Sequence, residues 1–242
     1  MFATFKYHKN LAPKIWGPDN SLNSLVSQSL QTIILDFTKY LSDVIGMPIS
    51  KSDIMDVFVH GSITNYYWDD CSDIDLCIIL NTTAFHDVTK LKNRILFDRA
   101  FISSWLRTYD ISIFGYGVDI SFVDKDSPRK VGPIYSLLKD RWLVPPKRIS
   151  KQELRRIKKL AKLRYRIMMH HCRYMLRHKM PSEYVDAYTT TIQRKRIDSM
   201  YQNPDQPITS MTMAFKMLRN TGILRKLRNY SRHDRSRKYQ LK

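Results

Sequence analysis

The sequence predicts an α/β chain in which a sheet flanked by helices is followed by a basic, all-α C-terminal domain. Between residues 21 and 124, short apolar runs that carry acids alternate with amphipathic segments of helical length. From residue 151 on, apolar residues recur at spacings of three and four among many Lys and Arg residues. We therefore expect four parts: an N-terminal arm (1–20), a sheet-containing domain (21–146), a basic helical domain (147–230) and a disordered basic tail (231–242).

The first predicted elements are the arm and one long helix. Pro13, Gly17 and Pro18 are turn and loop signals, so they favour an arm without regular structure. Apolar residues then recur at helical spacing over 21–45, and the pattern ends before Gly46. A helix that precedes the first strand packs against the sheet, and we assign it no chemistry.

The first strand is predicted to end in a turn suited to phosphate. Val57–Val59 is an apolar run, and His60, Gly61 and Ser62 follow it directly. Glycine lets the backbone come close to a ligand, backbone amides that open a turn bind anions, and the Ser62 hydroxyl is a further donor. The chain has no P-loop lysine motif, so metal ions and basic residues elsewhere would balance the phosphate charge.

The second strand carries two acids. Side chains alternate along a strand, so Asp73 and Asp75 point to one side while Ile74 and Leu76 reach the core. Two carboxylates on one face near the start of a strand predict a magnesium site. Asp also favours strand ends and turns, and an isolated Asp-x-Asp pair is more often structural than a metal ligand.

A third acid is predicted on a neighbouring strand, after a helix at about 86–106. Asp119 lies in the apolar run 117–123, between residues that face the other way. Taken alone, Asp119 is an exposed residue of a half-solvated strand. Beside the Asp73–Asp75 strand it becomes the third ligand, and Asp124 is the alternative.

Residues 54–124 resemble the nucleotidyltransferase superfamily, which includes DNA polymerase beta, poly(A)-adding and CCA-adding enzymes and small antibiotic nucleotidyltransferases. The resemblance implies a nucleotidyltransferase-type mixed sheet flanked by helices. It also implies that Gly61 and Ser62 bind the phosphates of an NTP. Asp73, Asp75 and Asp119 would be catalytic and would hold two divalent ions, Mg²⁺ or Mn²⁺. The motif does not indicate the acceptor.

A second, weaker resemblance lies downstream. The segment 131–142, with its Gly-x-x-Tyr-Ser-Leu-Leu pattern and a following Trp, is similar to a segment of predicted nucleotidyltransferases of tailed phages. This similarity suggests a phage origin. It does not indicate the acceptor either.

The charge of the chain is strongly asymmetric. The formal net charge is +19, yet residues 1–150 hold 17 Lys and Arg against 16 Asp and Glu, whereas residues 151–242 hold 24 against 6. Such a field attracts polyanions, and beside a metal-dependent phosphoryl site the natural polyanion is nucleic acid, with RNA favoured. The alternative is a solvated basic surface without such a partner.

The basic domain is predicted to begin after Pro145 and Pro146 with a long helix. Ser150 and Glu153 form a capping-box pattern, and an apolar stripe follows. Two more helices are expected at about 182–202 and 208–228. The candidate nucleic-acid contacts on the first helix are Arg155, Arg156, Lys158, Lys159, Lys162 and Arg166.

Cysteine usage favours a reducing compartment. Cys71, Cys77 and Cys172 show no Cys-x-x-Cys spacing, and no apolar run has the length of a signal peptide core or a membrane span. We expect a cytoplasmic protein that does not enter the membrane, in the host cytoplasm if a phage encodes it. A zinc site at His170, His171, Cys172 and His178 is the weaker alternative, because Cys172 falls on the apolar stripe.

Taken together, the sequence predicts a metal-dependent nucleotidyltransferase that transfers NMP from an NTP to an acceptor, most simply RNA, and releases pyrophosphate. One alternative is the same chemistry on a protein or small molecule, with the basic region recognising an acidic partner. Another is a nucleic-acid-binding protein without turnover. The complete set of three acids argues against that last alternative.

Overall fold

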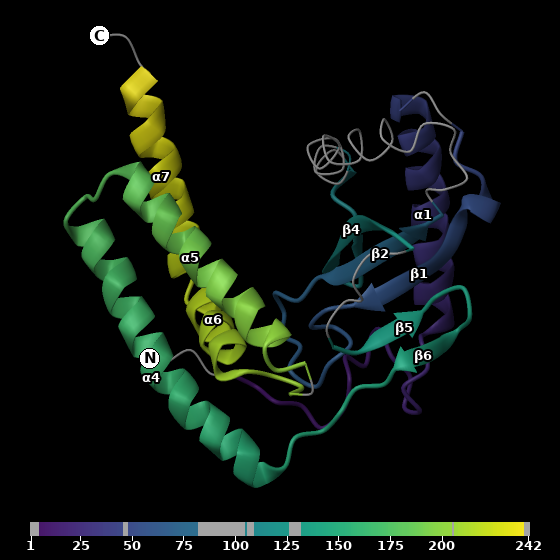
Figure 1. The fold of residues 1–242 in the computed structure, drawn as a ribbon, viewed down its shortest axis with the longest axis horizontal. Coiled ribbons are helices and arrows are strands. Elements are labelled where there is room, and N and C mark those ends of the chain that lie inside the picture. Colours follow the sequence, from purple (N-terminus) through teal and green to yellow (C-terminus); the bar gives the residue numbers. More distant parts are fainter. Residues whose placement is uncertain are drawn as a thin grey trace. The chain divides into compact units, whose positions relative to one another are not determined.

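The computed structural model describes residues 5–45, 48–81, 105, 109–125, 132–204 and 206–239. The chain forms two compact units. The sheet unit is Tyr7–Lys147, and the basic unit comprises Met1–Lys6 and Arg148–Lys242. The α/β class is confirmed, with a six-stranded mixed sheet and five α-helices among the described residues (Figure 1).

The sheet has the strand order β3-β4-β2-β1-β5-β6. Only the central pair β2 and β4 is parallel, and every other neighbouring pair is antiparallel. The short helix η1 (Lys51–Asp53) leads into β1. The strands are β1 (Ile54–His60), β2 (Ile74–Leu80), β3 (Ser112–Ile113), β4 (Tyr116–Asp124), β5 (Ile134–Ser136) and β6 (Arg141–Val144).

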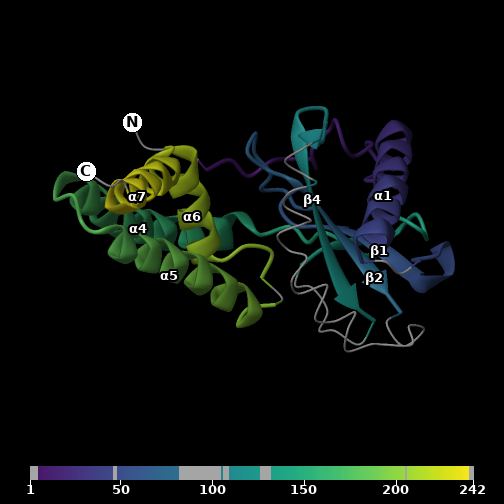
Figure 2. The same ribbon diagram turned by 90° about the horizontal axis from the view of Figure 1, so that it is seen from above.

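One face of the sheet packs against α1 (Ser24–Ile45), as Figure 2 shows from above. Val26, Leu30 and Phe37 of α1 are fully buried in one cluster with alternate residues of β1, β2 and β4. Their spacings of four and seven place them on one side of the helix. The expected helix over 21–45 is therefore present. Its apolar stripe packs against one face of the sheet, and together they form the core.

The N-terminal segment is packed rather than extended as an arm. Leu11, Ile15 and Trp16 are buried in the core cluster, and the Trp16 indole donates to the Ile63 carbonyl at 2.9 Å. Trp16 also stacks on Trp142, with ring centroids 4.7 Å apart. The turn signals at Pro13 and Gly17 shape a segment that covers the core.

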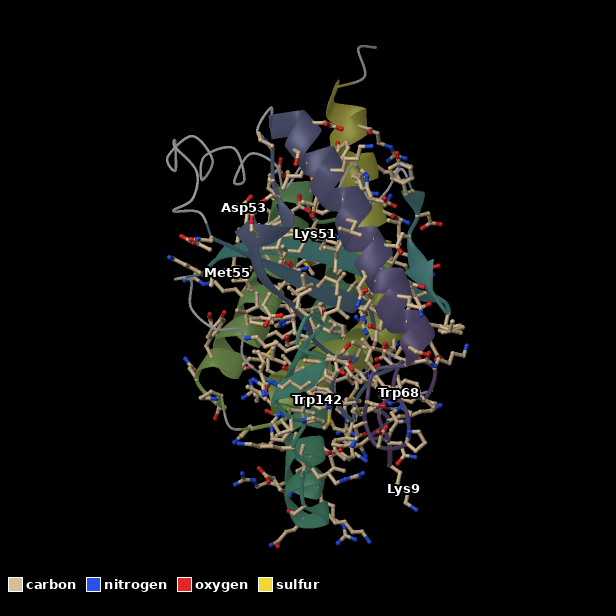
Figure 3. The ribbon with its side chains drawn as sticks, turned by 90° about the vertical axis from the view of Figure 1, so that its right-hand side faces the viewer. Lys9, Lys51, Asp53, Met55, Trp68 and Trp142 are labelled. Carbon is tan, nitrogen blue, oxygen red and sulfur yellow. The ribbon has the colours of Figure 1, made fainter. Side chains whose placement is uncertain are left out.

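Trp68 and Trp142, which are labelled in Figure 3, both form hydrogen bonds to this segment. The Trp68 indole donates to the Asn10 carbonyl at 3.1 Å, and His8 stacks on Trp68 with ring centroids 3.9 Å apart. The Trp142 indole donates to the Asn20 carbonyl at 2.9 Å. Both contacts join residues far apart in the sequence, so local patterns could not reveal them.

The described elements of the basic unit are four helices: α4 (Lys151–Arg177), α5 (Ser182–Tyr201), α6 (Ser210–Asn220) and α7 (Ile223–Tyr239). The α4 helix begins as expected, because the Ser150 hydroxyl accepts from the Glu153 amide at 3.1 Å. Residues Met211–Leu218 of α6 are all buried, since α6 contacts α4, α5 and α7 (Figure 2). A short apolar helix is thus the centre of this unit.

The last expected helix is two helices. Gly222, with φ of 74°, follows the end of α6 and lets the chain turn into α7. α7 then continues to Tyr239, so residues 231–239 are helical where a disordered tail was expected. Asp186 of α5 holds this end, accepting from the Ser231 hydroxyl at 2.7 Å and pairing with Arg235 at 3.2 Å.

Two further expectations concern single segments. The helix expected at about 86–106 lies outside the described residues, apart from Trp105, which is buried in the core cluster. No helix in the described part of the chain is both long enough and apolar enough to cross a membrane.

Candidate functional site

Gly61 and Ser62 directly follow β1 and open a tight turn. The Gly61 carbonyl accepts from Thr64 Oγ1 at 2.9 Å and from Asn65 Nδ2 at 2.8 Å, and the Asn65 amide donates to the Ser62 carbonyl at 3.2 Å. Thr64 and Asn65 are buried. Two buried polar side chains therefore fix the conformation of the turn that the sequence predicts as a phosphate site.

Asp75 on β2 and Asp119 on β4 are direct neighbours in the parallel register. The residues on either side of each Asp belong to the core cluster with α1, so alternation turns both Asp side chains to the opposite face. Asp73 precedes Asp75 by two residues, and Gly117 precedes Asp119 by two. A Cβ built on Gly117 would lie 3.4 Å from Asp73 Oδ1, so the Asp73 carboxylate lies over β4.

The Gly-Ser turn and the paired acids meet at Gly61. A Cβ on Gly61 would lie 1.8 Å from Asp75 Oδ2, and Gly61 has φ of 86°. Any larger residue would displace the Asp75 carboxylate as well as strain the backbone. The sequence predicts that Gly61 allows phosphate to approach the backbone closely. In the structure, the absence of a side chain at Gly61 also leaves space for the Asp75 carboxylate.

A histidine that the sequence patterns did not single out lies in the same row. His60, the last residue of β1, is directly opposite Asp75 in the antiparallel register. His60, Asp75 and Asp119 are therefore adjacent across three neighbouring strands and share one face of the sheet. The alternation of Val57 and Val59 as core residues was the signal in the sequence that places His60 on this face.

Ser62 is linked to the start of the acid-bearing strand. Its hydroxyl donates to Ser72 Oγ at 2.9 Å, and Ser72 Oγ accepts from the Asp69 amide at 2.9 Å. Ser72 is buried and immediately precedes Asp73. The link fixes the phosphate turn relative to the acids, and the Ser62 hydroxyl would have to turn away from Ser72 to donate to a ligand.

The alternative third acid, Asp124, lies elsewhere on β4. It pairs in register with Leu80, at the opposite end of β2 from Asp75. Asp124 lies five positions after Asp119, which is about 17 Å along the strand. Because side chains alternate between faces and five is an odd number, Asp124 points to the other face of the sheet. The register therefore favours Asp119 over Asp124.

The described part of the segment 131–142 contributes β5 and the start of β6, which form a hairpin. The Tyr135 hydroxyl donates to Asp140 at 2.6 Å, and burial raises the pKa of Tyr135 to about 12. Ser136 donates to the buried Asp56 carboxylate at 2.7 Å, and Lys139 pairs with it at 3.4 Å. The polar residues of this segment thus stabilise the sheet edge, and nothing in their contacts assigns them to an acceptor.

The candidate metal ligands can be judged by their donor chemistry and placement. Carboxylate oxygens are the ligands that Mg²⁺ prefers, and Asp73, Asp75 and Asp119 all lie on one face. Within the described ranges, no three or more His, Cys, Asp or Glu side chains converge as a group that could hold a metal ion. Mg²⁺ is commonly bound by one or two carboxylates together with substrate phosphates, so the donor set suits an ion that arrives with a nucleotide.

The predicted nucleic-acid contacts lie on α4 and are not equivalent. Arg155, Lys159, Lys162 and Arg166 are exposed, and their spacings of four, three and four align them in one stripe that is separate from the buried stripe of α4. Arg156 and Lys158 flank this stripe, and Lys158 is partly buried. We call the aligned four residues the basic stripe.

The alternative zinc site finds no support in the side chains. Cys172 is completely buried on the apolar stripe of α4, and burial raises the pKa of its thiol to about 11. The side chain of Cys172 therefore packs in the core of the basic unit, as its place on the apolar stripe predicts. His171 instead contacts the Tyr188 hydroxyl at 3.3 Å.

The sheet unit therefore combines a turn with backbone amides and three acids on one face of the sheet, Asp73, Asp75 and Asp119, which we call the acid row. The basic unit separately carries the exposed basic stripe. Comparisons with protein-family models, with curated proteins and with solved structures give no match to this chain.

Proposed function

We propose that this protein is a metal-dependent nucleotidyltransferase that transfers NMP from an NTP to an acceptor, with RNA the favoured acceptor, and releases pyrophosphate. The proposal includes a nucleotidyltransferase-type fold for the sheet unit and an all-α domain for the basic unit. One observation carries it. Asp75 and Asp119 are neighbours on parallel strands, and the Asp75 carboxylate lies directly against Gly61 of the Gly-Ser turn.

This juxtaposition is what transfer of a nucleotidyl group requires. A triphosphate brings several negative charges, which backbone amides and divalent cations can neutralise while positioning the reacting phosphorus. Asp73, Asp75 and Asp119 would hold the cations, Mg²⁺ or Mn²⁺. When bound, such ions balance the phosphate charge and lower the pKa of the attacking hydroxyl.

The residues of the chain have separable roles in this proposal. The backbone amides that begin at Gly61 would bind the leaving phosphates, and the Ser62 hydroxyl would add one donor. Asp119, the exposed acid at the edge of the row, would accept the proton of the attacking hydroxyl. Asp75, which is partly buried, would position the turn and the cation relative to each other.

The basic stripe of α4 would hold the acceptor. The sheet-bearing part is close to neutral, so it has little charge with which to retain a polyanion, whereas residues 151–242 carry 24 Lys and Arg against 6 Asp and Glu. A row of exposed cations along one helix face follows a nucleic-acid backbone without reading its sequence. This supports RNA over a protein or small-molecule acceptor.

The test is incubation of the full chain with each α-labelled NTP, Mg²⁺ or Mn²⁺, and a cell extract. Digestion of the labelled product with nuclease or with protease then identifies the acceptor. We expect nuclease-sensitive label. Protease-sensitive label would move the acceptor to protein, and no label from any NTP with either metal would contradict the proposed activity.

A matched pair of variants assigns the label to this site. Asp75→Asn removes one charge from the acid row, whereas Asp70→Asn removes the same charge from an exposed loop residue outside it. We expect Asp75→Asn to abolish labelling and Asp70→Asn to preserve it. Equal labelling by both variants would place the activity elsewhere.

A further inference from the structure

The basic unit contains a pocket of its own between α5, α6 and α7. Its volume is about 350 Å³, which is in the lower part of the range of small-molecule sites, about 300–1,000 Å³. This pocket is distinct from the acid row, since all of its residues lie in the basic unit. The lining residues are Val185, Asp186, Thr189, Gln193, Phe215, Arg219, Leu224, Arg225 and Arg228.

The charges of the pocket favour an anionic ligand. Three arginines line it, and Arg225 and Arg228 form no ion pair or hydrogen bond through their side chains with any other described residue. Asp186, the one acid of the lining, is already compensated, because its carboxylate accepts from Ser231 and pairs with Arg235 at 3.2 Å. Guanidinium groups bind phosphate oxygens in a fixed, bidentate geometry.

The rest of the lining is partly apolar. Leu224 is partly exposed, whereas Val185 is fully buried and Phe215 is 7% exposed, with the Arg196 guanidinium over its ring, 5.0 Å from the centroid. Leu224 therefore offers apolar surface to one face of a base. The Gln193 amide offers both a donor and an acceptor to the edge of a base.

The backbone fixes this arrangement. Thr189 and Gln193 are one helical turn apart on α5, and Arg225 and Arg228 are three residues apart on α7, so each pair shares one side of its helix. The positive φ of Gly222 sets the direction in which α7 leaves α6. The arginines of α7 and the amide of Gln193 on α5 therefore face the pocket from different helices of one packed unit.

We infer that this pocket binds a single phosphorylated nucleoside unit, with Arg225 and Arg228 on the phosphate and Gln193 at the edge of the base. The inference goes beyond the proposed transferase site and does not depend on it. The unit is either a free nucleotide or one nucleotide of a bound strand, because both present the same phosphate and base.

The test is calorimetric titration of the full chain with AMP in EDTA, which removes divalent ions needed at the acid row. We expect AMP to bind, and adenosine and inorganic phosphate to bind about tenfold more weakly or worse, since each lacks half of the contacts. Arg225→Gln with Arg228→Gln should weaken AMP binding by about tenfold or more. Absence of AMP binding by the unaltered chain would overturn the inference.

Two control variants keep the result specific. Arg232→Gln with Arg237→Gln makes the same charge change at exposed positions of α7 outside the pocket and should leave AMP affinity unchanged. Asp75→Asn should also leave it unchanged. An equal loss in the first control would mean that only net charge matters, and a loss in Asp75→Asn would assign AMP to the acid row; either result overturns the inference.

The trinucleotide ApApA has internal phosphates and no terminal phosphate. It therefore distinguishes binding of a free nucleotide from binding of one nucleotide of a strand. If it displaces AMP and loses affinity in the Arg225→Gln, Arg228→Gln variant, the pocket holds a nucleotide of a strand. If AMP binds and ApApA does not compete, the pocket holds a free nucleotide. Competition by ApApA that is insensitive to the two substitutions would contradict a shared pocket.

Discussion

The sheet unit and the basic unit differ in how they use charge. Residues 1–150 are nearly neutral, with 17 Lys and Arg against 16 Asp and Glu, and their candidate site depends on three acids held by strand register. Residues 151–242 carry a large excess of cations, many of them exposed on α4. Single substitutions should therefore be decisive in the first region, whereas the second should respond to groups of substitutions.

The largest effect is expected from Asp75→Ala. Loss of one carboxylate from the acid row should reduce nucleotide transfer by about a thousandfold, because preorganised electrostatics supply most of the rate in such chemistry. The melting temperature should stay unchanged or rise slightly, since like-charge repulsion in the row decreases. Transfer rate and thermal unfolding, measured on the same preparation, check both parts.

The other two acids sharpen this prediction. Asp73→Ala should behave as Asp75→Ala does, and Asp119→Ala should reduce transfer less completely. Retained turnover in Asp73→Ala would contradict the site assignment. Normal activity in Asp119→Ala would mean that the third acid is not in the row.

Gly61→Ala should produce the next largest effect, this time on stability as well. Both the positive φ and the Asp75 carboxylate oppose a Cβ at this position. Gly115 is the matched control, since it has φ of 87° and a Cβ added there would meet no atom within 4 Å. Gly115→Ala should cost only the backbone strain, about 1–2 kcal/mol, and chemical denaturation should show a clearly larger loss for Gly61→Ala.

A double variant separates the two causes. In an Asp75→Ala background the carboxylate is gone and only the Cβ of residue 75, 3.3 Å from the added Cβ, still crowds it. Adding Gly61→Ala should then cost only slightly more than Gly115→Ala alone. If Gly61→Ala costs the same with and without the Asp75 carboxylate, the close approach of turn and acid has no energetic consequence.

Neutralising the basic stripe should have a smaller effect, confined to binding. Changing Arg155, Lys159, Lys162 and Arg166 together to Gln should weaken RNA binding by more than about tenfold at moderate salt and flatten its salt dependence. Fluorescence anisotropy across a salt series measures both quantities. NTP binding in the presence of Mg²⁺ should survive.

The control carries the same charge change at scattered positions. It replaces four exposed cations elsewhere in the basic unit by Gln: Lys179, Lys195, Lys226 and Arg232. We expect a clearly smaller loss of RNA affinity than for the stripe. Equal losses would show that net charge, and not the aligned face of α4, determines binding.

The smallest effect concerns Tyr135 and pH. Its pKa is raised from 10.0 to about 12, so the folded state favours the protonated phenol. The protonated phenol of Tyr135 therefore stabilises the folded state fully below pH 10, and this stabilisation is lost as the pH rises toward 12. Tyr135→Phe should therefore be less stable than the unaltered chain at neutral pH, by about 0.5–1.5 kcal/mol for the hydrogen bond to Asp140.

The free-energy difference between the two proteins should shrink above pH 10. Urea denaturation at neutral pH and at several alkaline pH values measures this difference, and the other titrating groups contribute equally to both proteins. A difference that stays constant to pH 12 would contradict the raised pKa.

Local patterns predicted the long elements and failed on the short ones. The apolar spacing of α1 and α4 and the alternation of β2 and β4 were sufficient to identify them. The strands β3, β5 and β6 have two to four residues, too few for a period to be visible. The break between α6 and α7 depends on Gly222, a turn signal that the helical spacing on both sides obscured.

The acids of the candidate site were predictable and its histidine was not. Alternation placed Asp73 and Asp75 on one side of a strand, and Asp119 was expected on a neighbouring strand, where the register pairs it with Asp75. That His60 lies beside Asp75 follows from pairing between distant segments. The buried N-terminal segment was missed for the same reason, since Trp16 packs on Trp142, more than a hundred residues away.

Whether the acid row binds a metal ion together with a nucleotide can be measured with Mn²⁺ and a non-hydrolysable NTP analogue, by the loss of the free-ion electron paramagnetic resonance signal. We expect the unaltered chain and Asp70→Asn to bind Mn²⁺ when the analogue is present, and Asp75→Asn not to bind it. Mn²⁺ binding of equal strength in Asp75→Asn and Asp70→Asn would contradict the assignment of the acid row as the metal and nucleotide site.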